Sequence, residues 1–285
     1  MQKIIAATDF SLNATHAVRR AALVASAAAP ASLELLHVLP PAGRWARAIG
    51  PSEDEIGRFE RADAQLRAAA QLVRSTTDVA PNARIARGRV KAVIANAARD
   101  ADLLVVGAAR PSALLPVAGV GHGLIRTTRV PVLIVRNPPA HRYGRVLVAV
   151  DFATTPEKAI AVARHVAPGA RFDIVHAYQG AFEGRLRYAN VSDAALAHHR
   201  ADARRTAVLR VDELVSSQNA GAYLAAAHVV HGHPASEVLE KERQLGAGLV
   251  VVSRPARSLA GELLVPSVTA ILLESGSADV LVVPV

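Results

Sequence analysis

The chain has 285 residues, of which 51% are hydrophobic, and a formal net charge of +9 at pH 7. This composition is too apolar for a disordered chain, and the length suits about two domains of ordinary size. Cysteine is absent, which excludes disulfide bonds, thiol nucleophiles and cysteine-ligated metal centres. The apolar runs, such as residues 103–106 and 249–252, are far shorter than the roughly 20 residues that a membrane-spanning helix needs.

The N-terminal segment lacks a secretory signal pattern, because its apolar run ends at Asp9. We therefore expect a cytoplasmic protein without a membrane span. The positive charge raises the question of nucleic acid, since Lys and Arg neutralise phosphates. The basic residues are scattered, however, and aromatic residues, on which bases stack, make up only 4% of the chain. This pattern favours solvated basic helix faces over a nucleic-acid-binding surface.

The sequence contains two consecutive copies of one pattern. Its blocks recur in the same order, 3–11 as 145–153, 33–38 as 172–177, 88–94 as 232–238, 102–107 as 248–253 and 131–135 as 279–283. Two prolines in the segment 137–141 mark a linker between the copies. We therefore expect a first domain over residues 1–137 and a second over 142–285.

Short apolar runs alternate with segments of helical period in each copy, which is typical of βαβ units around a parallel sheet. The predicted fold class is α/β, with a doubly wound, five-stranded parallel sheet in each domain. The first helix should begin after Ser11, with one apolar face made of Ala14, Ala17, Val18, Ala21, Ala25 and Ala28. The second should run through Ile56, Phe59, Asp63, Leu66, Ala70 and Val73, with a counterpart through Leu196, Ala203, Ala207, Val211 and Leu214.

The last strand of each copy, 132–135 and 280–283, is short and apolar, as expected of an edge strand. Pairing of these two strands would hide their unpaired backbone groups. The sequence therefore predicts an intramolecular pseudo-dimer of the two domains. The alanine-rich helices over 60–75 and 194–215 are candidate surfaces for a further homo-oligomer.

Candidate ligand-binding residues follow the strands, because open parallel sheets bind ligands beyond the carboxyl ends of their strands. Asp9 and Asp151 are each the first acidic residue after an apolar strand. Their carboxylates could accept hydrogen bonds from an adenine amine or a ribose hydroxyl. The alternative is that each caps a turn or a helix.

The second strand of each copy ends in His37-Val38 and His176-Ala177. Backbone groups of Val38 and Ala177 could meet the edge of a base. A histidine at such a strand end is more often a residue with a satisfied ring than a catalyst.

The segment after the fourth strand is a candidate phosphate-binding loop, since glycines let the backbone approach an anion at a helix N-terminus. The first copy supplies Gly107, Gly119 and Gly121 there, and Arg110 as a positive charge. The second copy supplies Ser253 and Ser267.

These features together resemble the universal stress protein family. The resemblance rests on Asp after the first strand, His-Val after the second, Asp-Leu-Leu-Val-Val-Gly over 102–107 and Val-Pro-Val-Leu-Ile-Val over 130–135. It covers essentially the whole chain, twice, and implies the adenine nucleotide alpha hydrolase-like fold and a role in stress response.

ATP-binding members of this family carry a loop of Gly, two residues, Gly, nine residues, Gly, then Ser or Thr. The first copy matches only with Gly107, since Arg110 replaces the second glycine and the closing pair is Ala118-Gly119. In the second copy the four positions are Ser253, Ala256, Pro266 and Ser267. A side chain at a glycine position blocks backbone approach, and each lost hydrogen bond to a charged group costs about 1.5–3 kcal/mol. The sequence therefore predicts weakened or lost ATP binding.

The leading functional hypothesis is a non-catalytic universal stress protein. One alternative is an ATP- or AMP-binding sensor with slow hydrolysis in the first domain, although no Walker-type motif is present. Another is metal or small-molecule binding in the second domain, prompted by His228, His231 and His233. No Gly-x-Ser-x-Gly or His-Glu-x-x-His motif supports hydrolase chemistry.

Overall fold

A computed structural model describes residues 1–28, 30–41, 53–109, 120–179, 192–218, 223–255 and 268–285. The chain forms two compact units. The first comprises residues 1–142, 165–168 and 279–284, and the second comprises 143–164, 169–278 and 285. These units group residues that contact one another in space, whereas the predicted domains 1–137 and 142–285 follow the sequence repeat.

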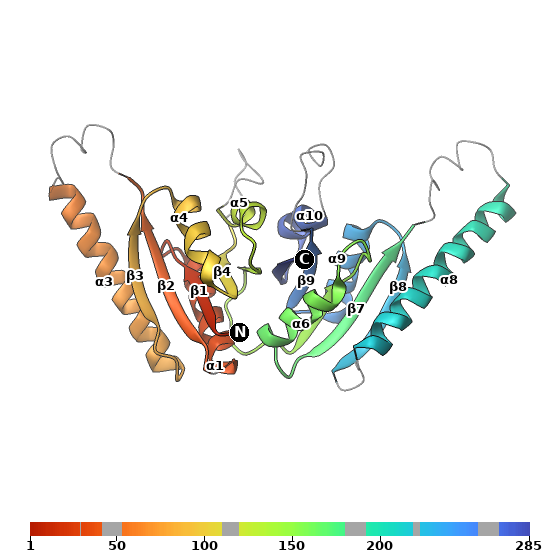
Figure 1. Cartoon of the computed structure of the whole chain (residues 1–285), viewed down its shortest axis with the longest axis horizontal. Helices are drawn as coiled ribbons and strands as arrows, with labels where there is room; N and C mark the ends of the chain where they lie inside the picture. Colours follow the sequence, from red (N-terminus) through yellow and green to blue (C-terminus); the bar gives the residue numbers. More distant parts are fainter. Residues whose placement is uncertain (29, 42–52, 110–119, 180–191, 219–222, 256–267) are drawn as a thin grey trace. The chain divides into compact units, whose positions relative to one another are not determined.

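The first unit is a parallel sheet covered by helices on both faces. The strands β1 to β5 have the order β3-β2-β1-β4-β5, with every neighbouring pair parallel. Helix α1 contacts β1, β4 and α3, and α3 contacts β2 and β3, while α4 packs against α5 on the opposite face (Figure 1). The elements are β1 (Lys3–Ala7), α1 (Leu12–Ala27), β2 (Ser32–Leu39), α3 (Glu53–Thr76), β3 (Asn82–Arg87), α4 (Val90–Ala97), β4 (Leu103–Gly107), α5 (Val120–Thr127) and β5 (Val132–Val135).

Helix α1 begins as expected, because Ser11 is its N-cap and the Ser11 Oγ accepts a hydrogen bond from the Ala14 N–H at 3.3 Å. The predicted apolar face is buried through Ala25, and Ala28 is the C-cap. The predicted second helix is confirmed, since α3 contains all of the residues expected from Ile56 to Val73. The buried stripe contains Ala62, and Ile56 and Phe59 are exposed, because they lie in the first turns, before the stripe.

The second unit repeats the arrangement. Strands β9, β6, β7 and β8 lie in that order and are parallel. Helix α8 contacts β7 and β8, and α9 contacts β6, β7 and α10 (Figure 1). The elements are β6 (Arg145–Ala149), α6 (Pro156–Val166), β7 (Arg171–Tyr178), α8 (Asp193–Ser217), β8 (Leu224–His231), α9 (Pro234–Leu245), β9 (Leu249–Arg254) and α10 (Val268–Ser275).

The last strand of the second repeat, β10 (Asp279–Pro284), belongs to the first compact unit. It pairs antiparallel with β5, and Leu281 lies opposite Leu133. The fully buried Asp279 side chain anchors its start, since Oδ1 accepts the Arg136 N–H at 2.8 Å and Oδ2 lies 3.5 Å from the Arg20 Nε. The predicted pairing of the two final strands is therefore confirmed, and with it the α/β fold built from a five-stranded repeat.

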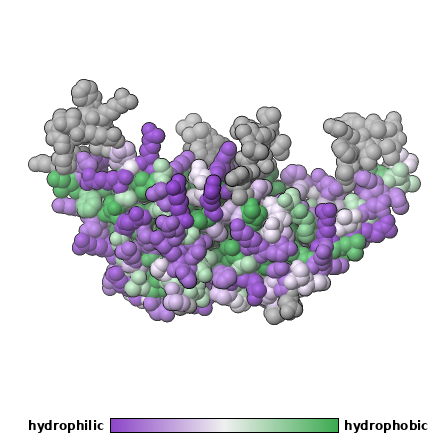
Figure 2. Space-filling view, viewed as in Figure 1, coloured by the Kyte–Doolittle hydropathy of each residue, from purple (hydrophilic) through white to green (hydrophobic). Residues whose placement is uncertain are grey.

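Hydrophilic and hydrophobic side chains are interspersed over the face of each unit drawn in Figure 2. Within the described ranges, no helix combines the length and the hydropathy that crossing a bilayer requires.

Candidate functional site

A tight turn follows β1. Phe10 has a positive φ of 64°, a conformation that side chains other than glycine rarely adopt. The exposed Asp9 carboxylate stabilises the turn, because its Oδ1 accepts the Ser11 N–H at 3.0 Å. The Thr8 Oγ1 accepts the Phe10 N–H at 3.0 Å. Asp9 thus has a local capping role, which leaves its Oδ2 free of hydrogen bonds to described residues.

The same turn follows β6. Phe152 has a φ of 55°, and the Asp151 Oδ1 accepts the N–H groups of Ala153 at 3.1 Å and Thr154 at 3.2 Å. It also accepts the Thr154 hydroxyl at 2.9 Å. Asp151 is therefore more heavily engaged in its own turn than Asp9 is.

The strand-end histidines of β2 and β7 form hydrogen bonds with the turns that follow β1 and β6. The Nδ1 atoms of His37 and His176 lie 2.8 Å from the carbonyl oxygens of Thr8 and Val150. A carbonyl only accepts, so the Nδ1 atom donates in both histidines. The ring of His37 also stacks on Phe10, with centroids 4.4 Å apart. These contacts give both histidines a structural role at the strand edge.

Val38 and Ala177 lie two positions beyond the last residues of β2 and β7 that pair with the central strand. Leu36 is the last to pair with β1, and Val175 is the last to pair with β6. Val38 and Ala177 therefore extend past the paired part of the central strands β1 and β6. Contact with a base edge at these positions remains a prediction.

Gly107 lies where β4 ends against the start of α1. A Cβ atom at this position would lie 2.5 Å from the Asn13 carbonyl carbon and 2.7 Å from the Ala14 nitrogen. The Asn13 amide donates to the Ala108 carbonyl at 2.7 Å, which fixes the contact. Close packing against α1 therefore explains the glycine at position 107 without any bound phosphate.

Gly121 also has a packing reason, because a Cβ there would lie 2.9 Å from the Ile134 Cδ1. Gly121 is in the first turn of α5. Arg110, Gly119 and Ser267, the other predicted loop residues, lie outside the described residues, as do Ala118, Ala256 and Pro266.

In the second unit Ser253 occupies the place of Gly107. The Ser253 and Thr154 hydroxyl oxygens are 2.6 Å apart. Thr154 gives its single proton to the Asp151 carboxylate, so Ser253 is the donor to Thr154. A relay of three polar side chains thus closes the space between the end of β9 and the turn before α6. The sequence did not predict this relay, although hydroxyl groups at both positions were visible.

The three histidines considered as metal ligands have separate environments. The His228 Nε2 lies 3.1 Å from Oδ1 of the buried Asp173, whereas the His231 ring packs edge-on against Tyr178 at 5.4 Å. Gly232, with a φ of 157°, breaks the strand alternation, and His233 becomes the N-cap of α9. The part of the chain that the structure describes contains no cluster of three His, Asp or Glu residues suited to a metal ion.

Asp173 is a fully buried carboxylate of the second unit that pairs with Arg145 and His228. Burial alone would raise its pKa, but hydrogen bonds from Arg145 and His228 outweigh that effect, and the pKa is lowered. The Arg145 Nε lies 2.8 Å from Oδ2. This ion pair lies at the start of β6 and β7, away from the strand-end turns, and its role is structural.

The described geometry defines the class of this protein. It is a duplicated parallel α/β domain in which an aspartate stabilises the turn after the first strand of each copy and a histidine bonds that turn to the neighbouring strand. A family model described as "Universal stress protein family" matches residues 1–136 and 142–284. The chain belongs to the universal stress protein family, with two such domains in tandem. No curated protein matches it.

Solved structures of similar length share this fold. A universal stress protein from Archaeoglobus fulgidus DSM 4304 is 18% identical, with a TM-score of 0.73, over 99% of this chain and 98% of that one. A putative universal stress protein from Pseudomonas aeruginosa UCBPP-PA14 is 17% identical, with a TM-score of 0.62, over 100% and 93%. At these identities the likeness establishes the fold.

Proposed function

We propose that this protein is a non-catalytic universal stress protein acting in stress response, with ATP binding weakened or lost in both repeats. The observation that carries the proposal is the relay from Ser253 through Thr154 to Asp151. Ser253, at the first glycine position of the loop pattern, carries a side chain. The Asp151 carboxylate, which would meet a ribose, already accepts three hydrogen bonds. A nucleotide would have to break this relay to reach the strand-end backbone of the second unit.

The first repeat is the better nucleotide site of the two. Gly107 is retained, and the Asp9 Oδ1 accepts one hydrogen bond from its own turn. Three of the four loop positions nonetheless depart from the family pattern in the sequence, because Arg110 and Ala118 replace glycines and Gly119 lacks the hydroxyl. An ATP or AMP sensor based on this repeat is therefore the second candidate function.

Calorimetric titration of the full chain with ATP and Mg²⁺ tests the proposal. We expect no saturable heat at low millimolar nucleotide. One site per chain that Asp9→Ala abolishes and Asp151→Ala leaves intact would support the sensor in the first repeat. Saturation of two sites per chain would contradict the loss in both repeats. Release of inorganic phosphate that depends on Asp9 would contradict the non-catalytic assignment.

A further inference from the structure

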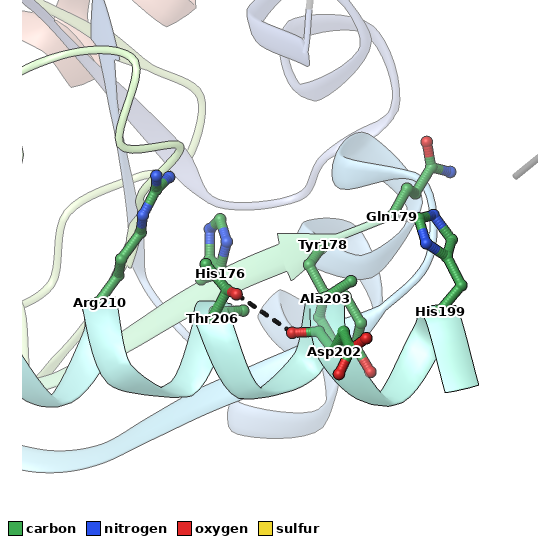
Figure 3. A pocket seen from close by; sticks show the side chains of 9 residues that line it. His176, Tyr178, Gln179, His199, Asp202, Ala203, Thr206 and Arg210 are labelled. Carbon is green, nitrogen blue, oxygen red and sulfur yellow. Dashed lines mark hydrogen bonds between the residues drawn. The ribbon is translucent and has the colours of Figure 1, made fainter. Parts of the chain in front are cut away.

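The second unit contains a pocket of about 340 Å³ between the end of β7 and helix α8 (Figure 3). From α8, His199, Ala203, Thr206 and Arg210 line it. Their spacing of four, three and four residues places them on one face of the helix. The size of the pocket is at the lower end of the range for small-molecule sites. It would hold one ring with one or two substituents.

A comparison with the first repeat explains the space. The stripe of α8 facing the sheet, Ala203, Ala207, Val211 and Leu214, has the same spacing as Ala62, Leu66, Ala70 and Val73 of α3. Ala207 therefore occupies the position of Leu66, which is 2% exposed. The smaller side chain leaves room beside β7. By the same alignment, Arg210 occupies the position of Ala69.

The two charged residues that line the pocket, Arg210 and Asp202, differ in whether they have partners. Arg210 makes no hydrogen bond or ion pair with any described residue, although it lines the pocket. The Asp202 carboxylate is instead engaged by Arg205 and lies 3.4 Å from the His198 Nε2. The hydrogen bond from Arg205 is the main reason that the pKa of Asp202 is lowered. The pocket thus offers one uncommitted positive charge.

Aromatic and small apolar groups line the pocket between Arg210 and Asp202. The rings of His176 and Tyr178 come from β7, and the methyl groups of Ala203 and Ala207 come from α8. The His176 ring is oriented by its hydrogen bond to the Val150 carbonyl, and the Tyr178 ring by its contact with His231. Ring edges and faces opposite methyl groups suit a flat, apolar ligand body.

We propose that this pocket binds a small aromatic carboxylic acid whose carboxylate pairs with Arg210. Arg210 and Asp202 are eight residues apart, roughly 12 Å along the helix, and Figure 3 shows them toward opposite ends of the drawn stretch. A hydroxyl group at the far end of the ligand would donate to Asp202. The pocket lies at the end of β7, but both charged contacts proposed for the ligand come from α8, so the proposal does not depend on the loss of ATP binding.

Titration calorimetry of the full chain with para-hydroxyphenylacetate tests the proposal, and para-hydroxyphenylacetamide serves as the uncharged analogue. We expect the acid to saturate one site per chain and the amide to bind at least tenfold more weakly. Arg210→Ala should weaken binding of the acid tenfold or more, because a charge-assisted hydrogen bond is lost. Ala207→Leu should abolish binding by filling the pocket.

Both substitutions introduce the residue of the first repeat at that position, so the helix should tolerate them, and circular dichroism checks this. Arg204→Ala removes an exposed charge from α8 outside the pocket and should leave binding unchanged. Equal binding of acid and amide, or unchanged affinity in Arg210→Ala, would overturn the proposal. So would the absence of saturation by the acid at low millimolar concentration.

Discussion

The Nε2 atom of His228 lies 3.1 Å from Oδ1 of Asp173, a carboxylate without exposed surface. The first repeat has the same arrangement with different residues. Val175 lies opposite His228 as Leu36 lies opposite Arg84, and the Arg84 Nε pairs with Glu34. The Lys3 Nζ of β1 lies 3.8 Å from the same Glu34 carboxylate. In both repeats one carboxylate therefore pairs with side chains of two neighbouring strands, but only the second repeat uses a histidine.

Replacing Asp173 should change how stability depends on pH. Its pKa is lowered in the folded state, so its stabilising contribution is present above the ordinary aspartate pKa of about 3.9 and is lost as the pH falls through the folded value. The gap in unfolding free energy between the wild type and Asp173→Asn should be largest near neutrality and shrink in acid. Urea denaturation at several pH values measures this gap. For Asp212→Asn, an exposed carboxylate in the same unit, the gap should stay small throughout.

Removing the His228 ring should destabilise the second unit. His228→Ala removes a hydrogen bond to a buried charge, which we expect to cost about 1–2 kcal/mol of unfolding free energy. His228→Gln, which retains an N–H donor, should recover part of the loss. His198→Ala breaks an exposed pair with Asp202 and should destabilise the unit much less. Equal effects of the two alanine variants would contradict this account.

Asp279→Ala should loosen the attachment of β10 to the first unit. The variant leaves the Arg136 N–H and the mostly buried Arg20 without this carboxylate, which should cost about 3 kcal/mol or more. Amide hydrogen exchange should accelerate at Leu281 and at Leu133 opposite it. Glu274→Ala, at an exposed position of α10, is the matched control. Unchanged protection of β10 in Asp279→Ala would show that this anchor is dispensable.

Gly107 and Gly57 should respond in opposite directions to alanine. Gly107→Ala places a methyl group 2.5 Å from the Asn13 backbone, so α1 must shift, and we expect a loss of about 1–3 kcal/mol. Gly57 lies in α3 with open space around its Cα, and Gly57→Ala should stabilise by about 0.5–1 kcal/mol. Thermal denaturation compares the two. A neutral Gly107→Ala variant would show that the β4–α1 contact adapts.

The sequence alone predicted the duplication, the alternation of strands and helices, the start of α1 and the pairing of the two final strands. These features depend on local patterns, namely alanines at helical spacing after Ser11 and apolar runs such as 132–135. The helix through Ile56 and Phe59 was also predicted, but the apolar periodicity did not show that these two residues are exposed in the folded protein.

The candidate site was predicted only as residue types at strand ends. Asp9 and Asp151 were expected at the carboxyl edge, but neighbouring hydrogen bonds decide how much of each carboxylate remains available. The relay through Ser253 links β9 to the turn before α6. The pocket beside Ala207 lies between β7 and α8. Only the tertiary structure decided them, because side chains far apart in sequence meet through packing that no local pattern encodes.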